Sequence, residues 1–234
     1  MIKAIVLDCG GVMVSPATGD WLLTPTFESV LGEDFIEKHL ERFRAVRARH
    51  FHFLPDTNRI DSDDEEYHLF KKLYHAVFEE MGLPLSDAQI DRIAFIQTYR
   101  DDRYCLFDDV LPYLSKWHGK YKLGIVSDAP PSTRRILTKM GVMDYINAAT
   151  FSCDIGVLKP DPSIYRSTID RLHVIPADAL FADDMPSKLR GAKDLGMRCV
   201  QMRRTMPGLF QAAPEWEGDV VHDFSELNQY VLQS

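Results

Sequence analysis

The chain has 234 residues, 45% of them hydrophobic, so it can bury a sizeable core and hold one α/β domain with a smaller inserted one. Its net charge of −8 argues against nucleic acid or an anionic membrane surface as a partner, because either would need a basic face. An apolar strand begins almost at Met1 and no apolar run approaches the ~20 residues of a membrane span, so we expect a cytoplasmic protein without a signal peptide.

The first expected element is a buried strand that ends in a carboxylate. The run from Ile2 to Leu7 is apolar apart from Lys3, as in a strand covered on both faces of a parallel sheet, and it leads into Asp8. One residue later, Gly10 and Gly11 allow the backbone to approach a ligand closely. Ligands of open α/β sheets bind at the carboxyl ends of the strands, so Asp8 is a candidate catalytic or metal-binding residue. Taken alone, the pattern also suits an aspartate that begins a turn.

Residues 15–104 interrupt the alternation of strands and helices and are predicted to form a helical cap domain. Apolar residues recur at helical spacing in the ranges 35–46 and 67–81, and a third helix is expected from Ser86, an N-cap, to Tyr99. An insertion after the first strand lies over the active edge of the sheet, where it can exclude water and select the substrate. The core domain then comprises residues 1–14 and 105–234.

Two charged segments stand out in the predicted cap. Four arginines either grip a phosphorylated or carboxylated substrate or lie on an exposed helix end; they are Arg42, Arg44, Arg47 and Arg49. The acidic run at 61–66 lacks the internal glycine and the ligand spacing of a calcium loop. It is therefore interpreted as a solvated helix start, with its acids at the positive end of the helix.

Polar residues follow the later strands at comparable positions. An apolar strand from Tyr121 ends in Ser127, and a lysine, Lys159, lies in a loop that two prolines constrain. A third apolar strand from Ala179 ends in the adjacent acids Asp183 and Asp184. A core helix from about residue 108, a short strand at 220–221 and a final helix over 225–232 complete the expected core.

This order resembles the haloacid dehalogenase superfamily, in its phosphatase-like branch with a helical cap of the C1 type after the first strand. Asp8 matches the nucleophile motif, Ser127 the second motif, Lys159 the third, and Asp183 with Asp184 the acidic fourth. Each motif is common by chance, but four in the right order are strong evidence together. The resemblance implies an α/β fold with a Rossmann-like three-layer core, a parallel sheet and the inserted α-helical cap.

The resemblance also implies an activity: a Mg²⁺-dependent phosphohydrolase that acts on a small phosphorylated metabolite through an aspartyl-phosphate on Asp8. The implied catalytic residues are Asp8, Ser127 and Lys159; Lys159 neutralises the equatorial oxygens and Ser127 donates a hydrogen bond to one of them. The implied phosphate-binding residues are Gly10, Gly11, Ser127, Asp128 and Lys159. The implied ligands of Mg²⁺ are Asp8, the carbonyl of Gly10, and one or both of Asp183 and Asp184.

One departure concerns the proton carrier. Typical phosphatases of this family have a second aspartate two residues after the nucleophile, and this chain has Gly10. General acid–base help contributes about 10²–10⁴-fold, so its loss predicts a slow enzyme or another source of the proton. Either good leaving groups are favoured, as in sugar 1-phosphates and aryl phosphates, or a bound water or a cap residue supplies the proton. The candidates in the cap are Asp20, His50, His52 and Asp56.

Two further departures follow the second and fourth motifs. Asp128 stands where the family usually has asparagine, and a carboxylate there repels phosphate unless the metal or Lys159 compensates. We expect it to be a residue at the start of a helix that points away. Lys188 stands where many relatives have a polar or acidic residue, and we expect it to be a solvated helix lysine.

Two other functions stay open. Gly10 and Asp128 also suit a catalytically weak or inactive phosphate-binding or regulatory relative. A 2-haloacid dehalogenase works without Mg²⁺ and usually lacks an acid pair, so the adjacent Asp183 and Asp184 argue against it, because two close acids are costly without a cation. Widely spaced cysteines indicate free thiols in a reducing compartment and no zinc site; they are Cys9, Cys105, Cys153 and Cys199. The expected assembly is a monomer or homodimer.

Overall fold

A computed structural model of the chain describes residues 1–23, 27–32, 34–50, 59–205, 214 and 216–233. Its main sheet has six strands in the order β5, β4, β1, β6, β7, β8, and every neighbouring pair is parallel. The strands are β1 (Ala4–Leu7), β4 (Lys122–Ser127), β5 (Ala148–Phe151), β6 (Ala179–Asp183), β7 (Arg198–Met202) and β8 (Val220–Val221). The predicted α/β fold with a parallel sheet is confirmed.

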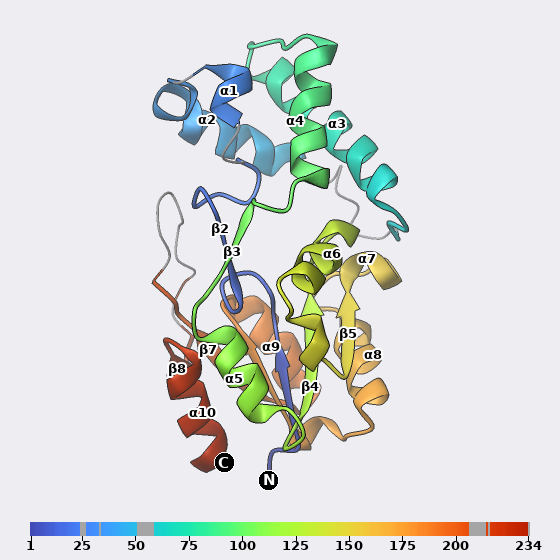
Figure 1. Cartoon of the computed structure of the whole chain (residues 1–234), viewed down its shortest axis with the longest axis vertical. Helices are drawn as coiled ribbons and strands as arrows, with labels where there is room; N and C mark the ends of the chain where they lie inside the picture. Colours follow the sequence, from blue (N-terminus) through green and yellow to red (C-terminus); the bar gives the residue numbers. More distant parts are fainter. Residues whose placement is uncertain (24–26, 33, 51–58, 206–213, 215, 234) are drawn as a thin grey trace.

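Helices cover both faces of this sheet because its central strand is apolar on both sides. Ile5 and Leu7 of β1 pack into one apolar cluster, and Ala4 and Val6 pack into the other. The first face is covered by α5 (Val110–Trp117), α6 (Pro131–Lys139) and α10 (Phe224–Gln233), and the second by α8 (Pro162–Leu172) and α9 (Pro186–Asp194). The result is a three-layer core (Figure 1). Shorter turns of helix are α7 (Ser152–Ile155), η2 (Met143–Tyr145) and η3 (Pro176–Asp178).

Four helices between residues 27 and 99 form a separate group at one end of the molecule (Figure 1), here called the inserted helices. They are α1 (Phe27–Leu31), α2 (Phe35–His50), α3 (Asp63–Glu80) and α4 (Asp87–Tyr99). They have an apolar cluster of their own, in which Phe27 contacts the rings of Phe43, Tyr74 and Phe78. None of the described helices is long and apolar enough to cross a membrane.

A two-stranded antiparallel ribbon connects the inserted helices to the core. It pairs β2 (Val14–Pro16) with β3 (Tyr104–Leu106), and its strands are too short to give a period in the sequence. The expected domain boundaries at residues 14 and 105 lie inside this ribbon. The two chain crossings between the helices and the core are therefore hydrogen-bonded to each other.

The expected helix ends are confirmed, with one correction. Ser86 caps α4 in a capping box with Gln89, and Gly82, at φ +64°, follows α3. Ser62 caps α3, whose first turn carries the acidic run. The expectation that this run is solvated is wrong for Glu66, which has no exposed surface.

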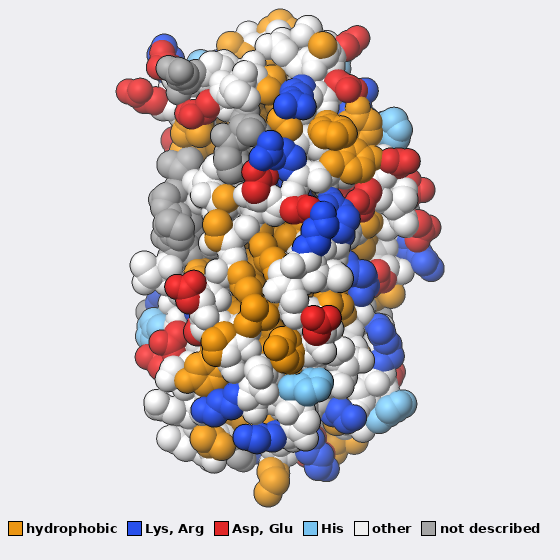
Figure 2. Space-filling view, viewed as in Figure 1, with side chains coloured by type: hydrophobic (Ala, Val, Ile, Leu, Met, Phe, Trp, Pro, Cys, Tyr) orange, Lys and Arg blue, Asp and Glu red, His pale blue; other side chains and the backbone are white. Residues whose placement is uncertain are grey.

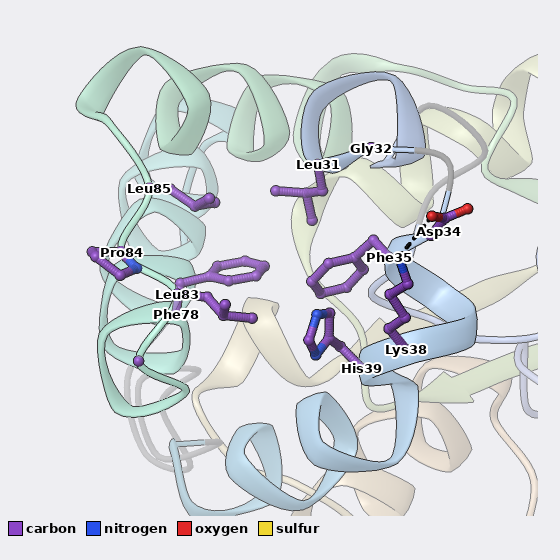
Figure 3. Close-up of a pocket in the computed structure, with 11 residues that line it drawn as sticks. Leu31, Gly32, Asp34, Phe35, Lys38, His39, Phe78, Leu83, Pro84 and Leu85 are labelled. Atoms are coloured by element: carbon purple, nitrogen blue, oxygen red, sulfur yellow. Dashed lines mark hydrogen bonds and ion pairs between the residues drawn. The ribbon is translucent and has the colours of Figure 1, made fainter.

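A cavity of about 550 Å³ lies within the inserted helices (Figure 3). Phe35 and His39 of α2 line it from one side, and Phe78 and Leu83 line it from the other. No predicted site residue lines it. The predicted site residues gather elsewhere, at the carboxyl edge of the sheet.

Candidate active site

Asp8 lies at the carboxyl end of the central strand, and the sheet register brings other polar residues beside it. Leu7 pairs with Ala182 of β6, and the Asp8 N–H donates to the Ala182 carbonyl at 2.9 Å. Asp183 is therefore the neighbour of Asp8 on the next strand. Asp8 is only 7% exposed and Asp183 is fully buried, so both carboxylates need partners within the protein.

Lys159 lies between these two carboxylates. Its Nζ donates a 2.6 Å hydrogen bond to Oδ2 of Asp183. The same Nζ forms an ion pair with Oδ1 of Asp8 at 2.8 Å. Oδ1 of Asp8 is buried and has no aligned hydrogen-bond donor among the described residues. Carboxylate oxygens of Asp8, Asp183 and Asp184 all lie within 4.8 Å of one another. The structure thus brings together four residues that come from three separate segments of the sequence.

The electrostatics of this cluster favour an additional cation. Burial, together with the neighbouring carboxylate of Asp8, raises the pKa of Asp183 to about 6. Burial and the charges of Asp183 and Asp8 raise the pKa of Asp184 well above its ordinary value. Burial alone would lower the pKa of Lys159. The negative charges of Asp183 and Asp8 have the larger combined effect, so the pKa of Lys159 is raised above its ordinary value. One ammonium thus faces three carboxylates, and oxygen donors at this spacing fit a hard divalent cation.

Gly11 allows Asp184 to reach the cluster. Its backbone has φ +70°, and a Cβ atom there would lie 2.7 Å from Oδ2 of Asp184. Gly10 is also approached by a side chain, because a Cβ atom there would lie 3.0 Å from Cζ2 of Trp21. The protein's own side chains therefore occupy the space that the two glycines leave open.

Ser127 ends β4, the neighbour of β1 on the other side, and is buried. Burial and the neighbouring charge of Asp8 raise the pKa of the Cys9 thiol, and the side chain of Ser127 acts in the opposite direction. Cys9 is therefore a packed, neutral side chain. All four cysteines are free, as expected.

Asp128 and Lys188 form an ion pair that contacts the backbone of Lys159, and we call this pair the bracket. Oδ1 of Asp128 accepts a 2.7 Å hydrogen bond from the backbone N–H of Lys159, and Oδ2 lies 2.9 Å from Nζ of Lys188. Nζ of Lys188 also donates to the Lys159 carbonyl. The expectations that Asp128 points away and that Lys188 is solvated are therefore wrong, because the two side chains are paired and hold the Lys159 loop.

The predicted proton carriers that the structure describes have other partners. Asp20 is buried, and its carboxylate accepts from Arg44 at 3.1 Å and Arg47 at 2.7 Å. His50 lies against Glu80, as does Arg49, and Arg42 is exposed. His52 and Asp56 lie outside the described residues.

The comparison with protein families agrees with this geometry. A family model described as haloacid dehalogenase-like hydrolase matches residues 2–196. The chain belongs to this family. In this haloacid dehalogenase-like hydrolase, Lys159 contacts Asp8 and Asp183, and Asp184 completes the cluster of carboxylates.

Known relatives of this haloacid dehalogenase-like hydrolase include phosphatases. The glyceraldehyde 3-phosphate phosphatase of Methanopyrus kandleri is 31% identical over 137 residues, 56% of this chain and 58% of the relative. The chain spans less than two thirds of the length of the first curated relatives that it matches.

Solved structures share the fold. A phosphatase from Thermococcus onnurineus has a TM-score of 0.65 at 23% identity, with 98% of both chains covered. An L-2-haloacid dehalogenase from Xanthobacter autotrophicus has a TM-score of 0.72 at 18% identity, with 99% of both chains covered. At these identities the likeness describes the fold and leaves the reaction to be argued from the site.

Two residues of this region, Trp21 and Glu66, were not predicted from the sequence to lie near the site. Trp21 comes from the segment that follows β2, and only the two adjacent glycines indicated that something approaches Gly10 closely. Glu66 of α3 accepts from the Ser132 hydroxyl at 2.6 Å and from its N–H at 2.9 Å, at the start of α6. An acid within a run of acids cannot be singled out by spacing alone.

Proposed function

We propose that this protein is a Mg²⁺-dependent phosphohydrolase that acts on a small phosphorylated metabolite with Asp8 as its nucleophile. The observation that supports this most is the cluster of Asp8, Asp183 and Asp184 within 4.8 Å, with Lys159 in contact with two of them. A phosphoryl group needs positive charge around it, and this cluster offers one ammonium together with oxygen donors for a metal.

In the proposed reaction, a carboxylate oxygen of Asp8 attacks phosphorus, and the bond from phosphorus to the ester oxygen breaks with its electron pair on that oxygen. Water then attacks the phosphorus of the aspartyl-phosphate, which releases inorganic phosphate and restores the carboxylate. Lys159 contacts the equatorial oxygens, and Ser127 donates a hydrogen bond to one of them.

Magnesium would be held by the carboxylates of Asp8, Asp183 and Asp184 and by the carbonyl of Gly10. When bound, it supplies the charge that lets an anionic nucleophile approach an anionic phosphate. The bracket of Asp128 and Lys188 keeps Lys159 at its place between the carboxylates, so both are positioning residues in this proposal.

A small phosphorylated substrate suits the surface better than a polyanion. On the face that Figure 2 shows, Lys and Arg side chains are interspersed with Asp and Glu, and the net charge of the chain is −8. We include a reducing cytoplasmic location in the proposal, which the free cysteines support.

Two alternatives are tested with the same assay. A dehalogenase would attack carbon with Asp8 and would have no need of the acid pair. A binding or regulatory relative would hold phosphate without releasing it. The pair of buried Asp183 and half-buried Asp184 disfavours the dehalogenase. The binding relative is distinguished by the absence of phosphate release.

The test is the release of inorganic phosphate from 4-nitrophenyl phosphate and sugar phosphates, and of chloride from 2-chloropropionate, with Mg²⁺ or with EDTA. The proposal expects phosphate release that needs Mg²⁺ and disappears in Asp8→Asn. Asp170→Asn is the matched control, because Asp170 is an exposed aspartate of α8. Chloride release that persists in EDTA would support the dehalogenase. Silence with every ester in a folded protein would support the binding relative.

A further inference from the structure

The indole ring of Trp21 lies where the side chain of residue 10 would begin. A Cβ atom added to Gly10 would lie 3.0 Å from Cζ2 and 3.1 Å from Cη2 of that ring. Carbon atoms at such distances are closer than ordinary packing allows. The six-membered edge of the indole thus covers the Cα of Gly10, two residues after Asp8.

Three contacts hold the segment of Trp21 in this position. The ring of Tyr104 in β3 packs edge-on to the indole, with centroids 5.6 Å apart. The side-chain amide of Gln97 in α4 donates to the Trp21 carbonyl at 3.1 Å. The preceding residue, Asp20, is fixed by the guanidinium groups of Arg44 and Arg47. The ring is therefore placed by the ribbon and by two of the inserted helices.

We propose that Trp21 replaces the missing acid with an apolar wall for the leaving group, which selects phosphate esters whose leaving oxygen departs without a proton. This inference rests on the proposed phosphohydrolase function and deepens it. Indole carbon carries no transferable proton, and Lys159 is committed to Asp8 and Asp183. The ester oxygen then leaves as an anion and takes its proton from solvent after the bond to phosphorus has broken.

The chemical class of the substrate follows from this wall. An acidic leaving group, such as a phenol or the anomeric hydroxyl of a sugar, stabilises the departing negative charge without help. A ring-shaped leaving group also presents an apolar face to the indole. Simple alkyl phosphates meet neither condition. For them, a general acid at residue 10 would raise the rate of hydrolysis by about 10²–10⁴-fold.

The experiment compares aryl phosphates of increasing phenol pKa, from nitrophenyl to phenyl, together with one alkyl phosphate. Four proteins are assayed with Mg²⁺: the wild type, Gly10→Asp, Trp21→Ala, and the double variant with both changes. We expect kcat/KM of the wild type to fall steeply as the phenol pKa rises. In the double variant, where an aspartate has room, the dependence flattens and the alkyl ester gains about 10²-fold or more.

Stability in urea gives a readout that is independent of activity. Gly10→Asp should lower the urea midpoint clearly in the wild-type background, because its side chain meets the indole, and much less beside Trp21→Ala. Trp21→Phe keeps an aromatic wall and serves as the conservative control, for which we expect the steep dependence of the wild type.

The outcomes separate this inference from the function on which it rests. A shallow dependence in the wild type, or a Gly10→Asp variant that is stable and flattens the dependence beside an intact Trp21, would overturn the role of Trp21 while the phosphohydrolase stands. Absence of phosphate release from every ester by every folded variant would overturn both.

Discussion

At the scale of single residues, the site depends on close approaches between side chains and glycine backbone. Gly11 illustrates this, because two independent features require it to be glycine: its φ of +70° and the carboxylate of Asp184 that would lie 2.7 Å from a Cβ atom. An alanine at this position would be strained by the positive φ, which lowers the stability of the fold. Its Cβ atom would also displace the carboxylate of Asp184, an acid of the candidate metal site.

For Gly11→Ala we therefore expect a loss of about 1–3 kcal/mol in the free energy of unfolding and a weaker response of activity to Mg²⁺. Gly119→Ala is the matched control, because Gly119 has a similar φ of +78° and nothing within 4 Å of its Cβ position. It should lose stability and keep its response to Mg²⁺. Urea unfolding and titration of activity with Mg²⁺ measure the two effects, and equal Mg²⁺ responses in both variants would contradict the role given to Asp184.

A second prediction concerns Lys188. In Lys188→Met, the carboxylate of Asp128 loses its ion pair and the Lys159 carbonyl loses a hydrogen bond, so the Lys159 loop is held less firmly. A hydrogen bond to a charged group contributes about 1.5–3 kcal/mol, so we expect kcat for phosphate release to fall by about tenfold or more. Lys193→Met removes an exposed lysine from the same helix and should leave kcat unchanged. Similar kcat values in both variants would show that the bracket does not position Lys159.

At the scale of elements, the junction of α3 with α6 connects the inserted helices to the core. Glu66 of α3 accepts two hydrogen bonds from Ser132 at the first turn of α6, and Arg103 lies 3.8 Å away. Nearby, Arg135 of α6 pairs with Asp63 of α3 at 2.9 Å. The junction is thus polar and largely buried, and its stability depends on the protonation of Glu66.

Burial raises the pKa of Glu66 to about 7, against the opposing charge of Arg103 and with a small contribution from Asp63 in the same direction. The folded protein holds the proton more tightly than the unfolded chain, whose glutamates have the ordinary value of 4.5. The wild type should therefore lose about 3 kcal/mol of unfolding free energy, relative to Glu66→Gln, as the pH rises from about 4.5 to about 7.

Urea unfolding at several pH values, for the wild type and Glu66→Gln, measures this difference, since all other titrating groups are shared. Glu65→Gln is the control, because Glu65 is the exposed neighbour in the same turn, and its profile should follow the wild type. Parallel profiles for the wild type and Glu66→Gln would mean that the pKa of Glu66 is the same in the folded protein and in the unfolded chain.

At the scale of the whole molecule, the sequence predicted those parts whose signal is local and continuous. The strands that end at Leu7, Ser127 and Asp183 were predicted because each is an apolar run buried on both faces of the sheet. The ribbon of β2 and β3 was not predicted, because strands of three residues show no period and their pairing joins distant segments.

Some residues of the candidate site could likewise be predicted from local sequence signals, and others could not. Asp8, Lys159 and the acid pair are each found after a strand or in a proline-bounded loop, and the parallel order of the sheet brings them to one edge. The pairing of Asp128 with Lys188 depends on how two helices and a loop pack. The approach of Trp21 to Gly10 depends on where the chain turns into the inserted helices, and neither contact has a spacing that could be recognised.

In the proposed reaction, Asp8 carries the phosphoryl group during turnover. The most direct measurement is mass spectrometry of the protein after acid quenching during hydrolysis of 4-nitrophenyl phosphate with Mg²⁺. We expect a mass increase of one phosphoryl group on the peptide that contains Asp8, and we expect this increase to be absent in EDTA and in Asp8→Asn. Phosphate release by the wild type with the phosphoryl group on another residue, or undiminished release by Asp8→Asn, would contradict it.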